Sequence, residues 1–441
     1  MLKRKIEKTL ESWKKRDGHK PLVVKGCRQC GKTYSVLHFA RHNYENVVYL
    51  NFVEQPELAQ AFSGSLTVDN IVLNLSPLLP GSSFTAGKTC IIFDEVQECP
   101  AARSSFKFFH LDGRFDVIAT GSLLGVKGYG LSDTSRQSIP VGYETIVEMY
   151  SLDFEEFLWA MGIGENVIEK VGECLKELTP VPEAIHNRFR DLLRQYTIVG
   201  GMPAVVEQFV NDKNLNEVLA MQRDIVDEYK DDIIKYAPVP LRSKIRQCFE
   251  SIPRQLSKEN KKFQYSLLAS GAKSSQYADC LQWIEDAGII IRCYNMNIPQ
   301  LPLDGNAIDS VFKVYMADSG LFVSMLGDGT QADILAGKLL TYKGAIVENL
   351  VAEIFHKMSR KLYYYRKDSG LEVDFVIRYK SHATLVEVKS GSGNTKSTRT
   401  ILNHPEKYGV MNAIKLGDYN IGNTNGMVTL PSYLAFMLRE M

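Results

Sequence analysis

A glycine-rich stretch near the start of the chain constrains its fold more than any other feature. Residues 26–33 read Gly-Cys-Arg-Gln-Cys-Gly-Lys-Thr and fit the phosphate-loop pattern G-x-x-x-x-G-K-[ST] without a mismatch. A short apolar strand over 21–24 is predicted before the loop, and a helix over 34–40 after it. This order aims backbone N–H groups and the start of a helix at one spot, which suits a phosphate group. A chance glycine-rich turn is the alternative interpretation.

The loop residues have different expected roles in binding ATP. Lys32 is expected to reach the β- and γ-phosphates, and Thr33 to supply a ligand position for Mg²⁺. The cysteines have the CxxC spacing of zinc and redox sites, but zinc or redox chemistry there would compete with phosphate binding. We therefore expect them to be small filler residues. The other residues expected to line the nucleotide are Gly26, Cys27, Arg28, Gln29, Cys30 and Gly31.

A second motif ends the apolar strand predicted over 89–93, which two carboxylates follow directly. Asp94 is expected beside Thr33, where it would hold Mg²⁺ through water. Glu95 is expected to orient or deprotonate an attacking water, which indicates hydrolysis and not passive binding alone. An acidic strand end in an ordinary turn is the alternative interpretation.

Strand and helix signals alternate over residues 17–160. Strands are predicted over 21–24, 47–52, 89–93, 115–120 and 143–150. The pattern predicts an α/β fold with an open, mostly parallel sheet and helices on both faces. Ligands bind at the carboxyl ends of such strands, so Ser122 or Thr120 is expected near the γ-phosphate or the water, unless it only closes a turn. Arg136 is expected either to reach the nucleotide of a neighbouring subunit in a homo-oligomer or to be a plain solvated arginine.

Composition limits the partners that the chain is expected to have. The 52 basic and 51 acidic residues leave a net charge of +1, so there is no global electrostatic sign of nucleic-acid binding. No run approaches the length of an apolar membrane span, and the N-terminus is charged throughout. The eight cysteines form no paired framework. A cytoplasmic protein without a membrane partner is expected.

Four domains are expected along the chain. They are a P-loop ATPase domain over 1–160, a helical lid over 161–240, a winged-helix-like domain over 241–300 and a second α/β domain over 301–441. A winged helix that reads DNA would carry arginine or lysine on the outer face of its second helix. Here that face holds Asp279, Glu285 and Asp286, so contact with a protein partner is as well supported as contact with DNA.

A second constellation of carboxylates lies in the last domain. Two segments, 372–377 and 385–389, alternate in polarity like strands and bring Asp374, Glu387 and Lys389 to one face if they pair in register. Glu348, on a predicted helix, is a further candidate ligand. The carboxylates would hold Mg²⁺, and Lys389 would stabilise a phosphorane or polarise a water. The spacing D-x₁₂-E-x-K is that of PD-(D/E)XK nucleases, and a half-exposed charged hairpin is the alternative.

Taken together, the chain resembles the bacterial and archaeal AAA+-type ATPases that join an N-terminal ATPase domain to a C-terminal domain of unknown function. The ordered matches span almost the whole chain: 25–33, 92–97, 119–122, 150–157, 199–203, 313–321, 372–375 and 387–391. The resemblance implies an ATPase core, a lid, a winged helix and a nuclease-like end, with Ser122 as the sensor residue. Relatives often carry Gly-Arg before the last strand of the sheet. Tyr143 follows Gly142 here, which leaves Arg136 as a substitute for the arginine that acts on the neighbouring subunit.

Two functions follow, in different classes. The first is a Mg²⁺-dependent ATPase that moves the lid and winged helix while the C-terminal module binds or cleaves DNA. The second is an ATP-gated regulator whose C-terminal modules dock proteins without phosphodiester chemistry. A small-molecule kinase is a third option, which the long multi-domain C-terminus disfavours.

Overall fold

The computed structural model describes residues 2–122, 142–336, 343–389, 395–424 and 427–439. Its N-terminal part holds a five-stranded sheet with the order β2-β3-β4-β1-β5, in which every neighbouring pair is parallel. The predicted open parallel sheet is confirmed. Its strands are β1 (Leu22–Gly26), β2 (Asn46–Asn51), β3 (Thr89–Asp94), β4 (Asp116–Ser122) and β5 (Thr145–Met149).

Helices cover both faces of this sheet because alternate strand residues point to opposite sides. Val24 and Ile92 belong to the apolar core that α1 and α2 complete, whereas Val23 and Ile91 belong to the core under α3, α4 and α5. The carboxyl ends of the strands stay open at one edge, where the phosphate loop follows β1. The helices are α1 (Ile6–Lys14), α2 (Lys32–Asn43), α3 (Val68–Leu78), α4 (Pro100–Ser104) and α5 (Phe106–Asp112).

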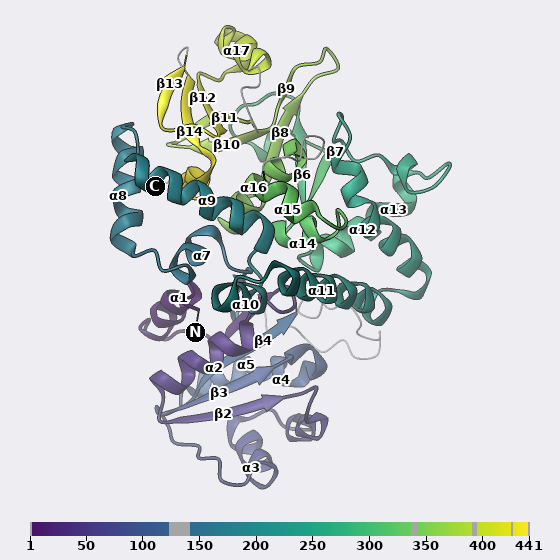
Figure 1. Ribbon diagram of the computed structural model, residues 1–441. Helices are drawn as coiled ribbons and strands as arrows, with labels where there is room; N and C mark the ends of the chain where they lie inside the picture. The colour runs from purple at the N-terminus through teal and green to yellow at the C-terminus, as the bar shows by residue number, and fades with distance from the viewer. Residues whose placement is uncertain (1, 123–141, 337–342, 390–394, 425–426, 440–441) are drawn as a thin grey trace.

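A helical region follows the sheet. Its members α10 and α11 lie between the parallel sheet and the C-terminal part of the chain (Figure 1). Pro203 begins α10, where proline is tolerated because the N–H group that it lacks would have no partner at a helix start. None of the helices in the described ranges has the length and apolar character needed to cross a membrane. The region comprises α7 (Phe154–Ala160), α8 (Glu165–Glu177), α9 (Glu183–Val199), α10 (Pro203–Asp212), α11 (Leu215–Tyr236), α12 (Arg242–Leu256) and α13 (Ser274–Asp286).

Two further sheets build the C-terminal part. A four-stranded sheet has the order β7-β6-β8-β9, and a five-stranded sheet has the order β10-β11-β12-β14-β13. Strand β6 pairs with both β7 and β8, so the segment expected as a winged helix shares a sheet with the segment expected as the last domain. The winged helix itself stays a prediction. The strands are β6 (Ile290–Met296), β7 (Ala307–Met316), β8 (Leu362–Arg366), β9 (Glu372–Val373), β10 (Phe375–Tyr379), β11 (His382–Val388), β12 (Asn412–Gly417), β13 (Gly422–Thr424) and β14 (Met427–Pro431).

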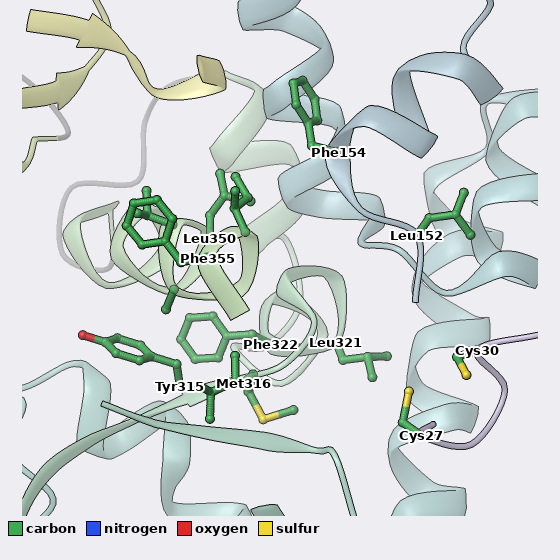
Figure 2. Packing of buried hydrophobic residues seen from close by; sticks show 14 of the residues in the cluster. Cys27, Cys30, Leu152, Phe154, Tyr315, Met316, Leu321, Phe322, Leu350 and Phe355 are labelled. Atoms are coloured by element: carbon green, nitrogen blue, oxygen red, sulfur yellow. The ribbon is translucent and has the colours of Figure 1, made fainter. Parts of the chain in front are cut away.

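One apolar cluster runs from the phosphate loop into the C-terminal part. Figure 2 shows Leu321 pointing from its helix toward the loop that carries Cys27 and Cys30, with Phe355 farther along the same cluster. Continuous burial of this kind favours a single packed body over loosely tethered domains. The C-terminal helices are α14 (Ser319–Ser324), α15 (Thr330–Leu335), α16 (Lys343–Lys357), α17 (Lys396–Leu402) and α18 (Pro405–Tyr408).

A buried carboxylate, Asp318, joins three parts of the chain. It caps α14 by accepting a hydrogen bond from the backbone N–H of Leu321 at 3.2 Å. It also accepts from the backbone N–H of Gly201 at 2.8 Å, before α10, and from the Ser151 hydroxyl at 3.1 Å, after β5. One side chain therefore connects the parallel sheet, the helical region and the C-terminal part.

A buried cation completes this cluster. The Lys357 ammonium of α16 lies 3.9 Å from Asp318 and 2.6 Å from Glu353. It also donates to the backbone carbonyl of Leu152 at 2.9 Å and to the Tyr196 hydroxyl at 3.1 Å. Burial alone would lower the pKa of Lys357, but Glu353 and Asp318 outweigh it and raise the pKa. The residues Ser151, Tyr196, Asp318, Glu353 and Lys357 are called the Asp318 cluster below.

Replacing Asp318 with alanine is expected to lower the free energy of unfolding by about 3 kcal/mol, because it leaves a buried ammonium and a buried amide with fewer partners. Urea denaturation followed by circular dichroism measures the change. Asp328→Ala is the matched control, because that carboxylate is 87% exposed and pairs with Arg223 at the surface. The control is expected to cost under about 0.5 kcal/mol. Equal losses in the two variants would contradict a joining role for Asp318.

Candidate functional site

The phosphate loop follows β1 at the open edge of the parallel sheet. Gly26 ends the strand, where a Cβ atom would lie 2.2 Å from the backbone carbonyl oxygen of Met149 on β5. Gly31 has a φ of +92° and leads directly into α2. Both positions therefore require glycine: the first for space and the second for its backbone angle. The 12-residue helix α2 places its N-terminus behind the loop, as an anion site needs.

The Lys32 side chain lies against the loop and is only 8% exposed. Its ammonium donates to the backbone carbonyl oxygens of Gly26 at 3.2 Å and Cys27 at 2.9 Å. The loop thus holds a positive charge among its own backbone groups, which suits the phosphates of a nucleotide. The thiols of Cys27 and Cys30 are buried beside it. The Cys30 thiol donates to the backbone carbonyl oxygen of Met149 at 3.4 Å, and the interaction between the two neighbouring thiols raises the pKa of Cys27 and lowers that of Cys30.

Asp94 and Thr33 meet where β3 ends beside the loop. The Thr33 hydroxyl donates to the two carboxylate oxygens of Asp94 at 3.0 and 3.1 Å. The hydroxyls of Thr120 and Tyr49 also donate to this carboxylate, the latter at 2.6 Å. Asp94 is therefore a buried carboxylate that accepts hydrogen bonds from three hydroxyls. Its carboxylate oxygens and the Thr33 hydroxyl are the kind of oxygen ligands that Mg²⁺ prefers. The sequence had placed Thr33 and Asp94 together, but it gave no sign of Tyr49.

The next residue, Glu95, has a left-handed backbone with φ +52°. Such an angle is uncommon for a non-glycine residue, and backbone strain of this kind can occur at functional sites. The Gln97 side-chain amide donates to the Glu95 carboxylate. Ser122 ends β4 and lines a small cavity beside the loop, whereas the Thr120 hydroxyl is bound to Asp94. Arg136 lies outside the described residues.

Helix α11 contacts the loop through charged groups. The Arg28 guanidinium lies 2.7 Å from the Asp232 carboxylate, and the Gln29 side chain donates to Glu228 of the same helix. Burial raises the pKa of Asp232 to about 6 against the opposing effect of Arg28. The cavity between α11 and the loop holds about 20 Å³, roughly one water, so these groups must separate to admit a larger ligand.

Arg4 is a site residue that the sequence did not reveal. The N-terminal helix α1 packs through Ile6, Leu10 and Trp13, and the basic residue just before it, Arg4, is buried as well. Arg4 is 7% exposed and donates to the backbone carbonyl oxygens of Cys30 at 2.9 Å and Tyr150 at 2.7 Å. It therefore links the phosphate loop to the segment that follows β5. A single arginine among seven basic residues at a charged terminus carries no pattern that could have marked it.

The second carboxylate constellation also comes together in space. Asp374 lies between β9 and β10 and accepts a hydrogen bond from the backbone N–H of Val388 at 2.8 Å. Lys389, one residue past β11, lies 2.6 Å from the Glu387 carboxylate. Burial raises the pKa of Asp374 to about 7, and the nearby charges of Glu348 and Glu387 add to the shift. The four predicted residues thus form one electrostatic cluster.

Glu348 already has three partners, which is more than expected for a carboxylate that is available to bind a metal ion. It lies 2.9 Å from the Lys313 ammonium and also bonds Lys261 and the Tyr315 hydroxyl. Burial pushes its pKa up, but the two ammonium groups outweigh burial and lower the pKa to about 2. Among the described residues, no group of three or more His, Cys, Asp or Glu side chains is arranged to hold a metal ion.

Three family models match successive parts of the chain. Residues 18–158 match a model described as an AAA domain, and residues 190–332 and 343–433 match two domains of unknown function, DUF8612 and DUF4143. The first match contains the parallel sheet, the phosphate loop and both Asp94 and Glu95. The N-terminal part of the chain is therefore an AAA-type P-loop ATPase domain. The other two descriptions name neither a winged helix nor a nuclease, so both stay predictions.

Solved structures with a similar arrangement include the Walker-type ATPase paby2304 of Pyrococcus abyssi, 14% identical, with a TM-score of 0.46 over 74% of this chain and 96% of that one. The ORC2 protein of Aeropyrum pernix in ADPNP–ADP complexes is 11% identical, with a TM-score of 0.40 over 76% and 94%. AMPPCP-bound DnaA from Aquifex aeolicus is 15% identical, with a TM-score of 0.28 over 64% and 87%. No curated protein sequence matches the chain. Because these three scores are below 0.5, the AAA-type character of the N-terminal part depends on the family-model match and the geometry of the loop.

Asp232→Asn is expected to raise the affinity for ATP about three- to tenfold, because it removes a negative charge facing the phosphate site and frees Arg28. Titration of a fluorescent ATP analogue with Mg²⁺ measures the dissociation constant. Asp231→Asn, at an exposed neighbouring position on α11, controls for the change in net charge. Weaker binding in Asp232→Asn than in the control would show that Asp232 supports the nucleotide.

Proposed function

We propose that the protein is a Mg²⁺-dependent ATPase whose nucleotide state acts on its C-terminal module, and that this module binds or cleaves DNA. The observation that carries the proposal is the meeting of Lys32, Thr33 and Asp94 at the carboxyl ends of β1 and β3 in an AAA-type domain. These are the positively charged group, the hydroxyl and the carboxylate that a phosphate loop needs for a nucleoside triphosphate and its metal.

Each residue has a distinct part in this proposal. The loop amides and the N-terminus of α2 receive the phosphates, and Lys32 moves from the loop carbonyls to the β- and γ-phosphates. Thr33 and Asp94 would hold Mg²⁺, which neutralises charge as the γ-phosphoryl group leaves. Glu95 orients or deprotonates the attacking water, with Gln97 fixing its carboxylate. Ser122, beside the loop, contacts the γ-phosphate or this water.

The Asp318 cluster is the proposed route from the nucleotide to the C-terminal part. A nucleotide that parts Arg28 from Asp232 displaces α11. Helix α11 packs on α14, whose first residues are held by Asp318. Because packed elements shift between discrete arrangements and deform little, a displacement of α11 changes the position of α14 and α16. A homo-oligomer with Arg136 acting on a neighbouring subunit, and a cytoplasmic location, remain part of the proposal.

The convergence of Asp374, Glu387 and Lys389 supports phosphodiester chemistry in the C-terminal module. In that role Asp374 and Glu387 would hold Mg²⁺, and Lys389 would polarise the attacking water or stabilise the phosphorane. A second function, an ATP-gated regulator that docks proteins, is favoured by the pairing of Glu348 with Lys261, Lys313 and Tyr315. Helix α13 contains no arginine or lysine, and its Glu285 is paired with Arg292, so this helix offers DNA no basic face.

Two substitutions separate ATP binding from hydrolysis. Lys32→Ala is expected to weaken ATP binding by about 100-fold, because the phosphates lose a charge-assisted contact. Glu95→Gln is expected to retain ATP affinity within about threefold while the turnover rate falls about 100-fold or more, because the water loses its base. Isothermal titration and a phosphate-release assay measure the two quantities. Lys88→Ala, on the surface away from the loop, is the control.

A nuclease assay separates the two functions of the C-terminal module. With Mg²⁺ and ATP, the wild type is expected to cleave DNA, and Asp374→Ala or Lys389→Ala is expected to lower the rate by about 100-fold or more. Asp368→Ala, exposed in the turn between β8 and β9, is the matched control. ATP turnover should also rise with DNA and fall with added salt if phosphates are contacted. Absence of both cleavage and DNA-stimulated turnover would leave the regulator as the function.

A further inference from the structure

A second cavity lies far along the fold from the phosphate loop. It holds about 160 Å³ between α9, the first turn of α16 and the ends of β11 and β12. No residue of the phosphate loop lines it. Part of its lining is aliphatic and includes Leu193, Ile346, Val347 and Leu350. Charged groups from four separate segments also line it, which makes the cavity a candidate site in its own right.

The charges that line this cavity are unbalanced. Four are cationic, namely Arg190, Arg194, Lys343 and Lys389, and one is anionic, Asp418. Asp418 is shared, because it bonds Arg190 and also lies 3.6 Å from Arg194. Lys389 is paired with Glu387 behind the cavity. The excess of positive charge favours an anionic ligand.

Lys343 adds to this excess. Among the described residues, no carboxylate lies within ion-pair distance of its ammonium, although its charge acts on Asp418 from farther away. A phosphate group at this cavity would be within the field of Lys343 and Arg194 together.

The cavity as a whole holds about 160 Å³, and aliphatic side chains form part of its lining. A cavity of about 150 Å³ with apolar walls is known to hold one aromatic ring of benzene size. A ligand that uses both the aliphatic and the cationic lining therefore carries a ring or base that fills the cavity and a phosphate that lies at its opening.

We propose that this cavity binds a nucleotide through its base and a terminal phosphate, independently of the phosphate loop. The nucleotide is either free or at the end of a nucleic-acid strand, since both present the same chemistry. Lys389 borders both the cavity and the carboxylate cluster of Asp374 and Glu387. A strand end bound in this cavity would therefore lie beside the carboxylate cluster. A free nucleotide bound there would affect the same cluster through Lys389.

The test uses the full-length Lys32→Ala variant, in which the phosphate loop no longer competes for the probe. Calorimetric titrations compare AMP, inorganic phosphate, and a short single-stranded oligonucleotide with and without a 5′-phosphate. We expect AMP or the phosphorylated oligonucleotide to bind, and Lys343→Glu or Leu193→Trp to weaken that binding by about tenfold or more. Arg188→Glu, on α9 outside the cavity, makes the same charge change and is expected to leave binding unchanged. Circular dichroism checks that each variant is folded.

Each outcome bears on the proposal. Binding of AMP but not of the oligonucleotide identifies a free nucleotide, and binding that requires the 5′-phosphate of the oligonucleotide identifies a strand end. If inorganic phosphate binds as tightly as AMP, the base contributes nothing to affinity, and the proposal that the cavity holds a base is overturned. Absence of binding by every probe, or binding that Lys343→Glu and Leu193→Trp leave unchanged, would overturn the site. None of these results depends on ATP turnover, so they are distinct from failure of the proposed ATPase.

Discussion

The Asp318 carboxylate is the interaction on which the arrangement of this chain depends. Its hydrogen bonds reach the segment after β5, the start of α10 and the start of α14, and Lys357 approaches it from α16. A buried charge is costly unless each of its oxygens is satisfied. Here backbone N–H groups, a hydroxyl and an ammonium satisfy it, so the relative position of three chain segments is set by one side chain.

The nucleotide site and the Asp318 cluster share the same helical region. Arg28 and Gln29 of the phosphate loop contact α11, and Gln222 of α11 donates to the carbonyl oxygens of Ile198 and Val199 at the end of α9. Those carbonyls lie just before Gly201, whose backbone N–H donates to Asp318. A nucleotide that moves α11 must therefore act on the cluster that holds the C-terminal part. This gives the proposed coupling a continuous physical path of packed and hydrogen-bonded groups.

Local signals explain what the sequence could predict. The phosphate loop, the strand that ends in Asp94 and the five strands of the sheet each follow from short patterns of glycine, charge and alternating polarity. The approach of Asp374, Glu387 and Lys389 also followed from alternation, although Asp374 lies between two strands and Lys389 follows the end of β11. Arg4, Tyr49 and the Asp318 cluster were missed, because their partners lie far away in the sequence and no periodic pattern marks such contacts.

Hydrogen exchange of the wild-type protein, with and without ATP and Mg²⁺, tests the central claim most directly. The account predicts slower exchange in peptides that cover residues 26–33 and 89–95, together with altered exchange in peptides that cover 313–321 and 343–357. The first pair reports the nucleotide on the loop and beside Asp94, and the second reports the Asp318 cluster. Unchanged exchange over 26–33 at saturating ATP would contradict the account.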